Sequence, residues 1–286
     1  MSYSIKELKT EGFTTSYCHA GEEHDETIIF LHGSGPGANG ESNWRYILPR
    51  FSLKYQVIAP DFVGFGKTEL PEDTNLTFWQ WTTLRVKQIL QLMDHHGIEK
   101  AHLVGNSMGG FIALSALMHS GDRFDKITLM GSGGAGPIST SPPIEIVRMT
   151  NFFKDPTIEA FRNLVTWFLY DESVIGDSLE EIVRLRYQNI MKPEVRELYP
   201  KLFPQSPLEL AIPVSALRRI KQDVLILHGY EDQFVPKEAS LFLMEHIPKA
   251  ELVMVKECGH WFQIEKEDRF VEYVDQFIGA REKVNV

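Results

Sequence analysis

Apolar runs of strand length recur along the chain, and between them lie longer stretches in which the apolar residues follow helical spacing. This alternation is typical of a parallel sheet that helices cover on both faces. The runs predicted as strands are residues 27–32, 57–60, 101–106, 127–130, 224–228 and 251–255. The stretches predicted as helices are residues 44–51, 78–97, 107–120, 237–246 and 266–280. The pattern therefore predicts an α/β fold with a mostly parallel sheet.

The N-terminal segment follows a different pattern. Residues 5–20 alternate polar and apolar side chains and are interrupted at Gly12. Alternation with a period of two favours strands, and glycine favours a turn between them. We expect a two-stranded antiparallel ribbon in this segment rather than a helix.

The alternation of strands and helices stops after residue 130 and resumes near residue 224. The intervening region opens with the Gly- and Pro-rich residues 131–143 and closes with Pro204, Pro207 and Pro213. Between them, helical patterns cover residues 144–153, 157–170, 179–191 and 194–203. A helical insertion between two strands, over the end of the sheet where ligands bind, is best explained as a lid. We expect an α/β core over residues 1–133 and 213–286, with a helical lid over residues 134–212.

The composition is that of a soluble globular protein, with 286 residues of which 43% are hydrophobic and 24% charged. The formal net charge of −10 and the lack of a Lys- or Arg-rich run argue against nucleic acid as a partner. No segment has the apolar length of a signal peptide or of a membrane span. An anionic substrate would need a local cation to hold it against this overall charge.

Two cysteines, Cys18 and Cys258, give neither a disulfide framework nor the spacing of a metal site. We interpret them as structural thiols. A reducing compartment, the cytoplasm, is the expected location.

Residues 105–109 read Gly-Asn-Ser-Met-Gly and lie between an apolar strand pattern and an apolar helix pattern. A Gly-x-Ser-x-Gly sequence in this context predicts a sharp turn that exposes the serine as a nucleophile, and the strained turn leaves no room for side chains beside it. The alternative is a helix that begins with an ordinary serine cap. The context favours Ser107 as the nucleophile of a serine hydrolase.

A serine hydroxyl needs a histidine to take its proton and an acid to orient that histidine. In the fold that carries this turn, both follow the serine in the chain, each on a loop after a later strand. Asp232 lies after the strand predicted at residues 224–228, and His260 lies on a glycine-containing loop after the strand predicted at residues 251–255. Glu231 competes with Asp232, which we favour because its shorter side chain suits the orienting role.

An oxyanion hole of backbone N–H groups completes this chemistry. Met108, directly after the serine, supplies one N–H group. The second is expected from Ser34, within residues 32–37 (His-Gly-Ser-Gly-Pro-Gly). A phosphate cradle is the competing interpretation of this loop, but the Gly-Lys-Ser/Thr ending is lacking. Residues 176–179 (Gly-Asp-Ser-Leu) match the signature of another esterase superfamily, and we interpret them as the start of a lid helix.

Together these motifs resemble those of the meta-cleavage product hydrolases of bacterial aromatic degradation, which have the α/β-hydrolase fold. The resemblance extends from about residue 12 to residue 278. It is carried by residues 32–38 (His-Gly-Ser-Gly-Pro-Gly-Ala), 42–44 (Ser-Asn-Trp), 105–110 (Gly-Asn-Ser-Met-Gly-Gly), 185–188 (Leu-Arg-Tyr-Gln) and 258–261 (Cys-Gly-His-Trp).

The resemblance implies hydrolysis of a carbon–carbon bond in an anionic dienoate of the 2-hydroxy-6-oxohexa-2,4-dienoate type. The implied products are 2-hydroxypenta-2,4-dienoate and a carboxylic acid, and neither a cofactor nor a metal is implied. The resemblance also implies a homo-oligomer. In the implied mechanism the dienol is first ketonised, with the histidine as proton carrier, and the serine then attacks the distal ketone. Attack by water through a gem-diol is the alternative.

The match with the family places Asn43, Asn106, Arg186 and Trp261 around the carboxylate and enol end of the substrate, and Gly33 joins them as a substrate-binding residue. Arg186 suits a bidentate carboxylate clamp, because the acidic protein needs a fixed cation in its pocket. Arg184, two positions earlier, has an equal claim from composition alone.

The group beyond the distal carbonyl is the least defined part of the substrate. The apolar candidates for its subsite are Ile138, Trp167, Phe168, Val235 and Trp261. Residues 32–37 and 185–188 resemble the corresponding stretches of relatives that take small aldehyde or alkyl groups. Two other functions remain open: a carboxylesterase with the same triad, and a ligand receptor that binds without turnover.

Overall fold

Eight strands form one sheet in the computed structural model, which describes residues 3–10, 12–136, 144–176, 178–204 and 206–280. The strand order is β1-β2-β4-β3-β5-β6-β7-β8. β1 (Ser4–Lys9) pairs antiparallel with β2 (Thr14–Ala20), and β2 pairs antiparallel with β4 (Gln56–Pro60). Gly12, in the turn between β1 and β2, has a φ of +99°, which favours glycine. The predicted N-terminal ribbon is confirmed.

The other strand pairs are parallel and join β4 to β3 (Thr27–Leu31), β5 (Ala101–Asn106), β6 (Phe124–Met130), β7 (Val224–Gly229) and β8 (Ala250–Val255). Every residue of β3, β5 and β7 is buried. Burial on both faces explains why these strands read as unbroken apolar runs.

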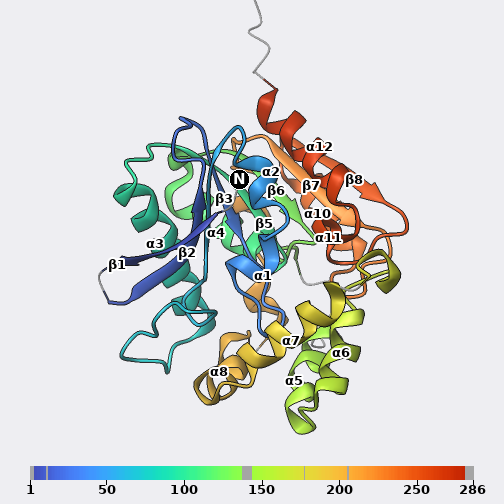
Figure 1. Ribbon diagram of the computed structural model, residues 1–286. Coiled ribbons are helices and arrows are strands. Elements are labelled where there is room, and N and C mark those ends of the chain that lie inside the picture. Colours follow the sequence, from blue (N-terminus) through green and yellow to red (C-terminus); the bar gives the residue numbers. More distant parts are fainter. Residues whose placement is uncertain (1–2, 11, 137–143, 177, 205, 281–286) are drawn as a thin grey trace, which may run out of the picture.

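Successive residues of the central strands enter two separate cores. Ile28 and Phe30 of β3 lie in one apolar cluster, whereas Ile29 and Leu31 lie in the other. Helices α3 (Phe78–His95), α4 (Met108–Ser120) and α10 (Lys237–His246) contribute to the second cluster, and α1 (Gly40–Trp44), α2 (Leu48–Phe51), α11 (Phe262–Glu265) and α12 (Glu267–Gly279) contribute to the first. In Figure 1, α3 and α12 accordingly flank opposite sides of the sheet.

The helix predicted over residues 44–51 is wrong in its extent, because two shorter helices replace it. The side chain of Asn39 accepts a hydrogen bond from Ser42 N–H, and the side chain of Ser42 accepts one from Asn39 N–H. This reciprocal cap makes α1 begin earlier than the apolar pattern indicates. Pro49 lies at the start of α2, where its missing N–H costs nothing but prevents one continuous helix.

Four helices between β6 and β7 form the segment that we call the lid: α5 (Ile144–Asn151), α6 (Ile158–Thr166), α7 (Ser178–Ile190) and α8 (Pro193–Leu198). Figure 1 shows them grouped at the bottom of the view, at one end of the sheet. Buried lid residues such as Phe161 and Ile182 belong to the same apolar cluster as α3 and α4. A short helix α9 (Val214–Leu217) and 3-10 helices over Gly121–Arg123, Phe152–Lys154, Glu172–Val174, Tyr199–Leu202 and Pro207–Leu210 complete the described structure.

Candidate active site

Ser107 occupies a strained turn between β5 and α4, with φ of +56° and ψ of −116°. A Cβ atom on Gly109 would lie 2.1 Å from Leu31 O, and one on Gly105 would lie 2.5 Å from Gly109 O. Only glycine fits at either position. The serine side chain makes no capping hydrogen bond to the helix. The geometry is therefore that of a nucleophile elbow and not of an ordinary helix cap.

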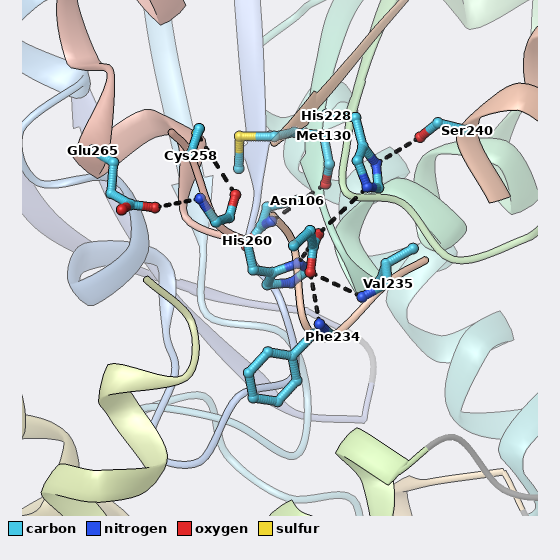
Figure 2. Close-up of polar contacts among 11 residues, drawn as sticks. Asn106, Met130, His228, Phe234, Val235, Ser240, Cys258, His260 and Glu265 are labelled. Atoms are coloured by element: carbon cyan, nitrogen blue, oxygen red, sulfur yellow. Dashed lines mark hydrogen bonds and ion pairs between the residues drawn. The ribbon is translucent and has the colours of Figure 1, made fainter. Parts of the chain in front are cut away.

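Asp232 lies in the loop after β7 and His260 in the loop after β8. His260 Nδ1 is 2.7 Å from Asp232 Oδ2, and both side chains are almost fully buried. Asp232 Oδ1 accepts hydrogen bonds from the N–H groups of Phe234 (2.7 Å) and Val235 (2.9 Å), as Figure 2 shows. Burial raises the pKa of Asp232, but His260, His228 and the hydrogen bond from Val235 outweigh it and hold the pKa below its ordinary value. The carboxylate is thus charged and fixes the imidazole.

His228 and Glu231 are neighbours of this pair with other partners. His228 Nδ1 lies 2.8 Å from Ser240 Oγ, its Nε2 is 3.9 Å from Asp232 Oδ2, and burial lowers its pKa. Figure 2 shows the contact of His228 with Ser240. Glu231 Oε2 accepts a hydrogen bond from Cys258 N–H (3.2 Å). Asp232, and not Glu231, therefore contacts the histidine.

The loop after β6 links the serine to the Asp232–His260 pair. Gly133 N–H donates to Ser107 O (3.2 Å). A Cβ atom on Gly131, whose φ is +50°, would lie 2.9 Å from His260 Nδ1 and 3.0 Å from Asp232 Oδ2. The carboxyl ends of β5, β6, β7 and β8 thus bring Ser107, Asp232 and His260 to one edge of the sheet.

The glycine-rich loop after β3 lies against the serine. A Cβ atom on Gly33 would lie 3.0 Å from Asn106 Oδ1 and 3.2 Å from Ser107 Cβ. Asn106 Nδ2 in turn donates to Met130 O (3.3 Å). Ser34, the next residue of the loop, accepts a hydrogen bond at its carbonyl oxygen from the Tyr199 hydroxyl of the lid (2.7 Å). The loop predicted to supply an oxyanion-hole N–H group is thus fixed from both sides.

Arg186, on α7, is buried against the same loop. Its Cζ lies 4.5 Å from the centre of the Trp261 ring, and a Cβ atom on Gly35 would lie 3.4 Å from its Nη1. Nε and Nη2 of Arg186 have no hydrogen-bond partner among the described residues. Burial lowers the pKa of this guanidinium to about 10, so it stays charged at neutral pH. Arg184 is exposed, so Arg186 is the buried one of these two arginines.

Asn43 lies buried on α1, and its Nδ2 also lacks a hydrogen-bond partner within the described part of the chain. The backbone carbonyl oxygen of Asn43 accepts a hydrogen bond from Nε2 of Gln263 (3.3 Å), which lies two residues after Trp261. No hydrogen bond in the described residues joins Asn43 to Asn106 or Arg186. Asn43 thus contacts α11, which follows Trp261, and within the described residues it has no hydrogen bond to Asn106 or Arg186.

Phe168 is stacked between two aromatic rings beside the histidine. Its ring centre lies 3.8 Å from that of Phe234 and 4.8 Å from that of Trp261, with interplanar angles of 6° and 12°. Phe168 and Phe234 lie 5.7 and 5.6 Å from the His260 ring. Phe234 did not emerge from the sequence, since nothing distinguishes it from other loop aromatics. The ring of Trp167 instead lies under the guanidinium of Arg148, with 3.4 Å between Arg148 Cζ and the ring centre. Ile138, another predicted subsite residue, lies outside the described residues.

Arg85 carries a second buried guanidinium, which did not emerge from the sequence. Its Nη1 lies 3.5 Å from Met108 Sδ, its Nε donates to Val63 O (3.4 Å), and burial lowers its pKa to about 9. On α3, Arg85 lies four positions after Trp81 and four before Ile89, and all three are buried on one face of the helix. This spacing, with an arginine on an apolar face, is the sequence signal that could have identified Arg85.

Among the described residues, no group of three or more His, Cys, Asp or Glu side chains is arranged to hold a metal ion. None of the described helices is long and apolar enough to cross a membrane. Cys18 and Cys258 are both buried free thiols.

Comparison with known proteins places the chain in a family. A family model described as "Alpha/beta hydrolase family" matches residues 28–273. The 2-hydroxymuconate semialdehyde hydrolase of Pseudomonas sp. (strain CF600) is 36% identical over 256 residues, which cover 88% of this chain and 86% of that protein.

Two solved structures are similar over nearly the whole chain. The 2-hydroxy-6-oxo-6-phenylhexa-2,4-dienoate hydrolase from Rhodococcus sp. strain RHA1 is 37% identical, with a TM-score of 0.92 and coverage of 98% of this chain and 99% of that one. The meta-cleavage product hydrolase from Pseudomonas fluorescens IP01, a serine-to-alanine mutant complexed with acetates, is 37% identical, with a TM-score of 0.85 and coverage of 96% and 97%. This chain therefore belongs to the alpha/beta hydrolase family and, within it, to the meta-cleavage product hydrolases, the family that its motifs indicated.

Proposed function

We propose that this enzyme hydrolyses a carbon–carbon bond in a 2-hydroxy-6-oxohexa-2,4-dienoate, an aromatic ring meta-fission product, to 2-hydroxypenta-2,4-dienoate and a carboxylic acid. The names of the relatives support this substrate class, since two of them act on a semialdehyde and on a phenyl-substituted dienoate. The observation that carries the proposal is the buried guanidinium of Arg186, which has no carboxylate partner among the described residues and lies beside the proposed catalytic residues.

A buried cation without a counter-ion costs several kcal/mol, and a carboxylate ligand removes that cost. Arg186 offers free donors in a mostly apolar surrounding, with the flat face of Trp261 behind it. The carboxylate end of a dienoate meets these requirements. An ester without an acid group does not use this cation, which favours the dienoate over a plain carboxylesterase substrate.

The catalytic roles follow from the chemistry of the three residues. Ser107 is the nucleophile, His260 takes and returns its proton, and Asp232 holds the imidazole in the correct tautomer. The N–H groups of Ser34 and Met108 form the oxyanion hole. The proposal is supported by the 2.7 Å contact of His260 with Asp232 and by the packing of Gly33 against Ser107.

In the proposed mechanism, the dienol is first ketonised, and His260 carries the proton from oxygen to carbon. Ser107 Oγ then attacks the distal carbonyl carbon, while its proton passes to His260. The carbon–carbon bond breaks, and its electron pair leaves with the dienoate fragment, which takes the proton from His260. Water, activated by His260, finally hydrolyses the acyl-serine and releases the carboxylic acid.

The substrate-binding set of the proposal is Gly33, Asn43, Asn106, Arg186 and Trp261. Asn43 has a buried, unpartnered Nδ2 that is suited to an enol or carboxylate oxygen. Gly33 lets the backbone lie close to the reacting carbons, because a side chain there would be crowded against Asn106 and Ser107. The lid, with proposed bounds 134–212 between core parts 1–133 and 213–286, closes over the substrate.

A spectrophotometric panel tests the proposal. Dienoates with hydrogen, methyl, isopropyl or phenyl at the distal carbon lose their yellow colour on cleavage, and we expect the wild type to turn over at least the small members many times. The Ser107→Ala variant is expected to bind them without turnover. Equal activity of that variant would contradict the nucleophile, and rapid turnover of aryl esters with no dienoate cleavage would favour an esterase.

A single-turnover experiment tests the covalent step. Rapid quenching followed by mass spectrometry is expected to find acylated Ser107 while product forms. Product formation without any acyl-enzyme under the same conditions would favour attack by water through a gem-diol.

We further propose that the enzyme works in the cytoplasm as a homo-oligomer and needs neither nucleic acid nor a membrane as partner. The two buried free thiols support a reducing compartment. Light scattering on the purified protein measures the oligomeric state, and a monomeric mass at micromolar concentration would contradict the oligomer.

A further inference from the structure

The carboxylate of Glu265, on α11, connects two segments that are far apart in the sequence. Its Oε1 accepts hydrogen bonds from Tyr170 N–H (2.7 Å) and Asp171 N–H (3.1 Å), in the segment that follows α6 of the lid. Its Oε2 accepts one from Gly259 N–H (2.7 Å), the residue before His260. Figure 2 shows Glu265 beside Cys258, and Cys258 lies on the loop that leads to His260. Each oxygen thus serves a different segment.

The two segments are also in direct contact. Trp261 N–H donates to Phe168 O (3.1 Å). A Cβ atom on Gly259 would lie 2.8 Å from Phe168 O, from Leu169 C and from Tyr170 N, so only glycine allows this approach. Phe168 is in addition stacked on Trp261. The end of the lid segment therefore rests on the backbone that places the histidine.

Glu265 is buried, with 5% of its surface exposed. A buried carboxylate that loses its hydrogen-bond donors is strongly unfavourable, because nothing replaces the lost solvation. Movement of either segment alone would leave one oxygen without a donor. The carboxylate of Glu265 thus holds the two segments together, because losing the N–H donors of either segment is unfavourable.

We propose that Glu265 is a positioning residue that fastens residues 168–171 of the lid to the histidine loop, residues 258–261, so that the seating of the lid and the placement of His260 occur together. This inference rests on the proposed function, in which His260 is the general base. Its consequence is that the proton acceptor is correctly placed only when the lid is seated over the substrate. A lid that opens for product release would also release the histidine loop.

The Glu265→Gln variant tests this role, because an amide has one acceptor oxygen where the carboxylate has two. Whichever way the amide turns, its NH2 group faces an N–H group, and one of the two segments loses its acceptor. Two readouts are measured at pH 8: kcat for 4-nitrophenyl acetate, which needs the triad but not the dienoate subsites, and hydrogen exchange of the peptides that contain residues 168–171 and 258–261. We expect kcat to fall by about tenfold or more and both peptides to exchange faster.

Asp61→Asn is the matched control. Asp61 is also 5% exposed, and its two oxygens accept hydrogen bonds from Gly40 N–H and Lys67 N–H, away from the histidine loop. This control is expected to leave the ester kcat unchanged, although it too replaces one acceptor oxygen of a buried carboxylate. An equal fall of kcat in both variants would overturn the proposal. Faster exchange confined to the lid peptide, with normal ester kcat in Glu265→Gln, would also overturn it.

Glu265→Asp, which keeps the charge but shortens the reach by one methylene, is measured alongside. We expect the same fall in ester kcat and the same faster exchange of both peptides. Glu265→Asp replaces Glu265→Gln if the latter does not fold. A wild type that hydrolyses the ester but no dienoate would refute the proposed substrate, yet the ester and exchange readouts would still decide the role of Glu265.

Discussion

The guanidinium of Arg186 lies over the ring of Trp261, with 4.5 Å between Cζ and the ring centre. One residue belongs to the lid and the other to the loop after the last strand. Gly37 lets the loop after β3 approach the backbone of Arg186, since a Cβ atom there would lie 2.1 Å from Arg186 O. The segment called the lid therefore supplies a buried cation to the candidate site.

Arg186→Met is expected to raise KM for a dienoate about 10- to 100-fold, because a charged hydrogen-bonding partner of the carboxylate is lost. Hydrolysis of a neutral aryl ester should change little. The free energy of unfolding should stay the same or increase, since a buried unpaired charge is replaced by an apolar side chain. Steady-state kinetics with both substrates and urea unfolding measure these effects.

Arg184→Met is the matched control for that prediction, because Arg184 lies on the same helix and is exposed. It should leave KM for the dienoate unchanged. A rise in KM with Arg184→Met, but not with Arg186→Met, would show that the carboxylate clamp has been assigned to the wrong arginine.

Gly109→Ala is expected to destabilise the protein by about 3 kcal/mol, since its Cβ atom would collide with backbone of β3. The distance to Leu31 O would be 2.1 Å. Gly279→Ala, at the end of α12, has no atom of the described residues within 4 Å of the added Cβ and should be at most about 1 kcal/mol more stable than the wild type. Urea denaturation compares the two variants, and equal stabilities would contradict the tight elbow.

Asp61 gives a stability that depends on pH. Burial raises its pKa to about 6, although the N–H groups of Lys67 and Gly40 oppose the rise. The folded protein therefore binds this proton more tightly than the unfolded chain, whose carboxyl titrates near 3.8. Its contribution to stability is largest at low pH and is lost as the pH rises through 6.

The measurement is urea unfolding of the wild type and of Asp61→Asn at pH 4.5 and 7.5. The stability of the wild type relative to the variant should be about 2 kcal/mol greater at pH 4.5. A difference between the two proteins that does not change with pH would show that Asp61 titrates normally in the folded state.

Arg85→Met removes a buried guanidinium that has no carboxylate among its hydrogen-bond partners. Desolvation of this charge is unfavourable, and the apolar surroundings of Phe65 and Trp81 suit a methionine. We expect a melting temperature equal to or above that of the wild type, measured by calorimetry. A decrease in the free energy of unfolding of more than about 2 kcal/mol in Arg85→Met would mean that the hydrogen bond of Arg85 to Val63 O outweighs the cost of desolvating its charge.

The sheet could be predicted from the sequence because burial on both faces leaves unbroken apolar runs. The strand at Ala101–Asn106 has the predicted bounds, and the other parallel strands differ from the prediction by a few residues at their ends. The lid helices were also visible, since their apolar residues follow a period of 3.6. Helix ends were less certain, and the segment around Pro49 broke into two helices because capping and proline act locally.

The residues of the candidate triad could be ordered from the sequence, because in this fold the acid and the histidine lie on later strand-end loops. The motif with Ser107 predicted the turn, and its glycines supplied the reason for it. The acid was chosen between Glu231 and Asp232 by side-chain length, and the 2.7 Å contact with His260 supports that choice.

By itself the sequence determined what is local or periodic: the strands, the helices, the elbow at Ser107 and the order of the catalytic residues. Only the tertiary structure decided which cation is buried, which aromatic ring stacks on Trp261 and which carboxylate joins the lid to the histidine loop. The match at residues 185–188 pointed to Arg186, but composition alone gave Arg184 an equal claim, and only burial separates the two. Phe168 and Glu265 have no local signal for their roles. The physical reason is that burial and hydrogen-bond partners depend on segments far apart in the chain, which meet only when the sheet and the lid have assembled.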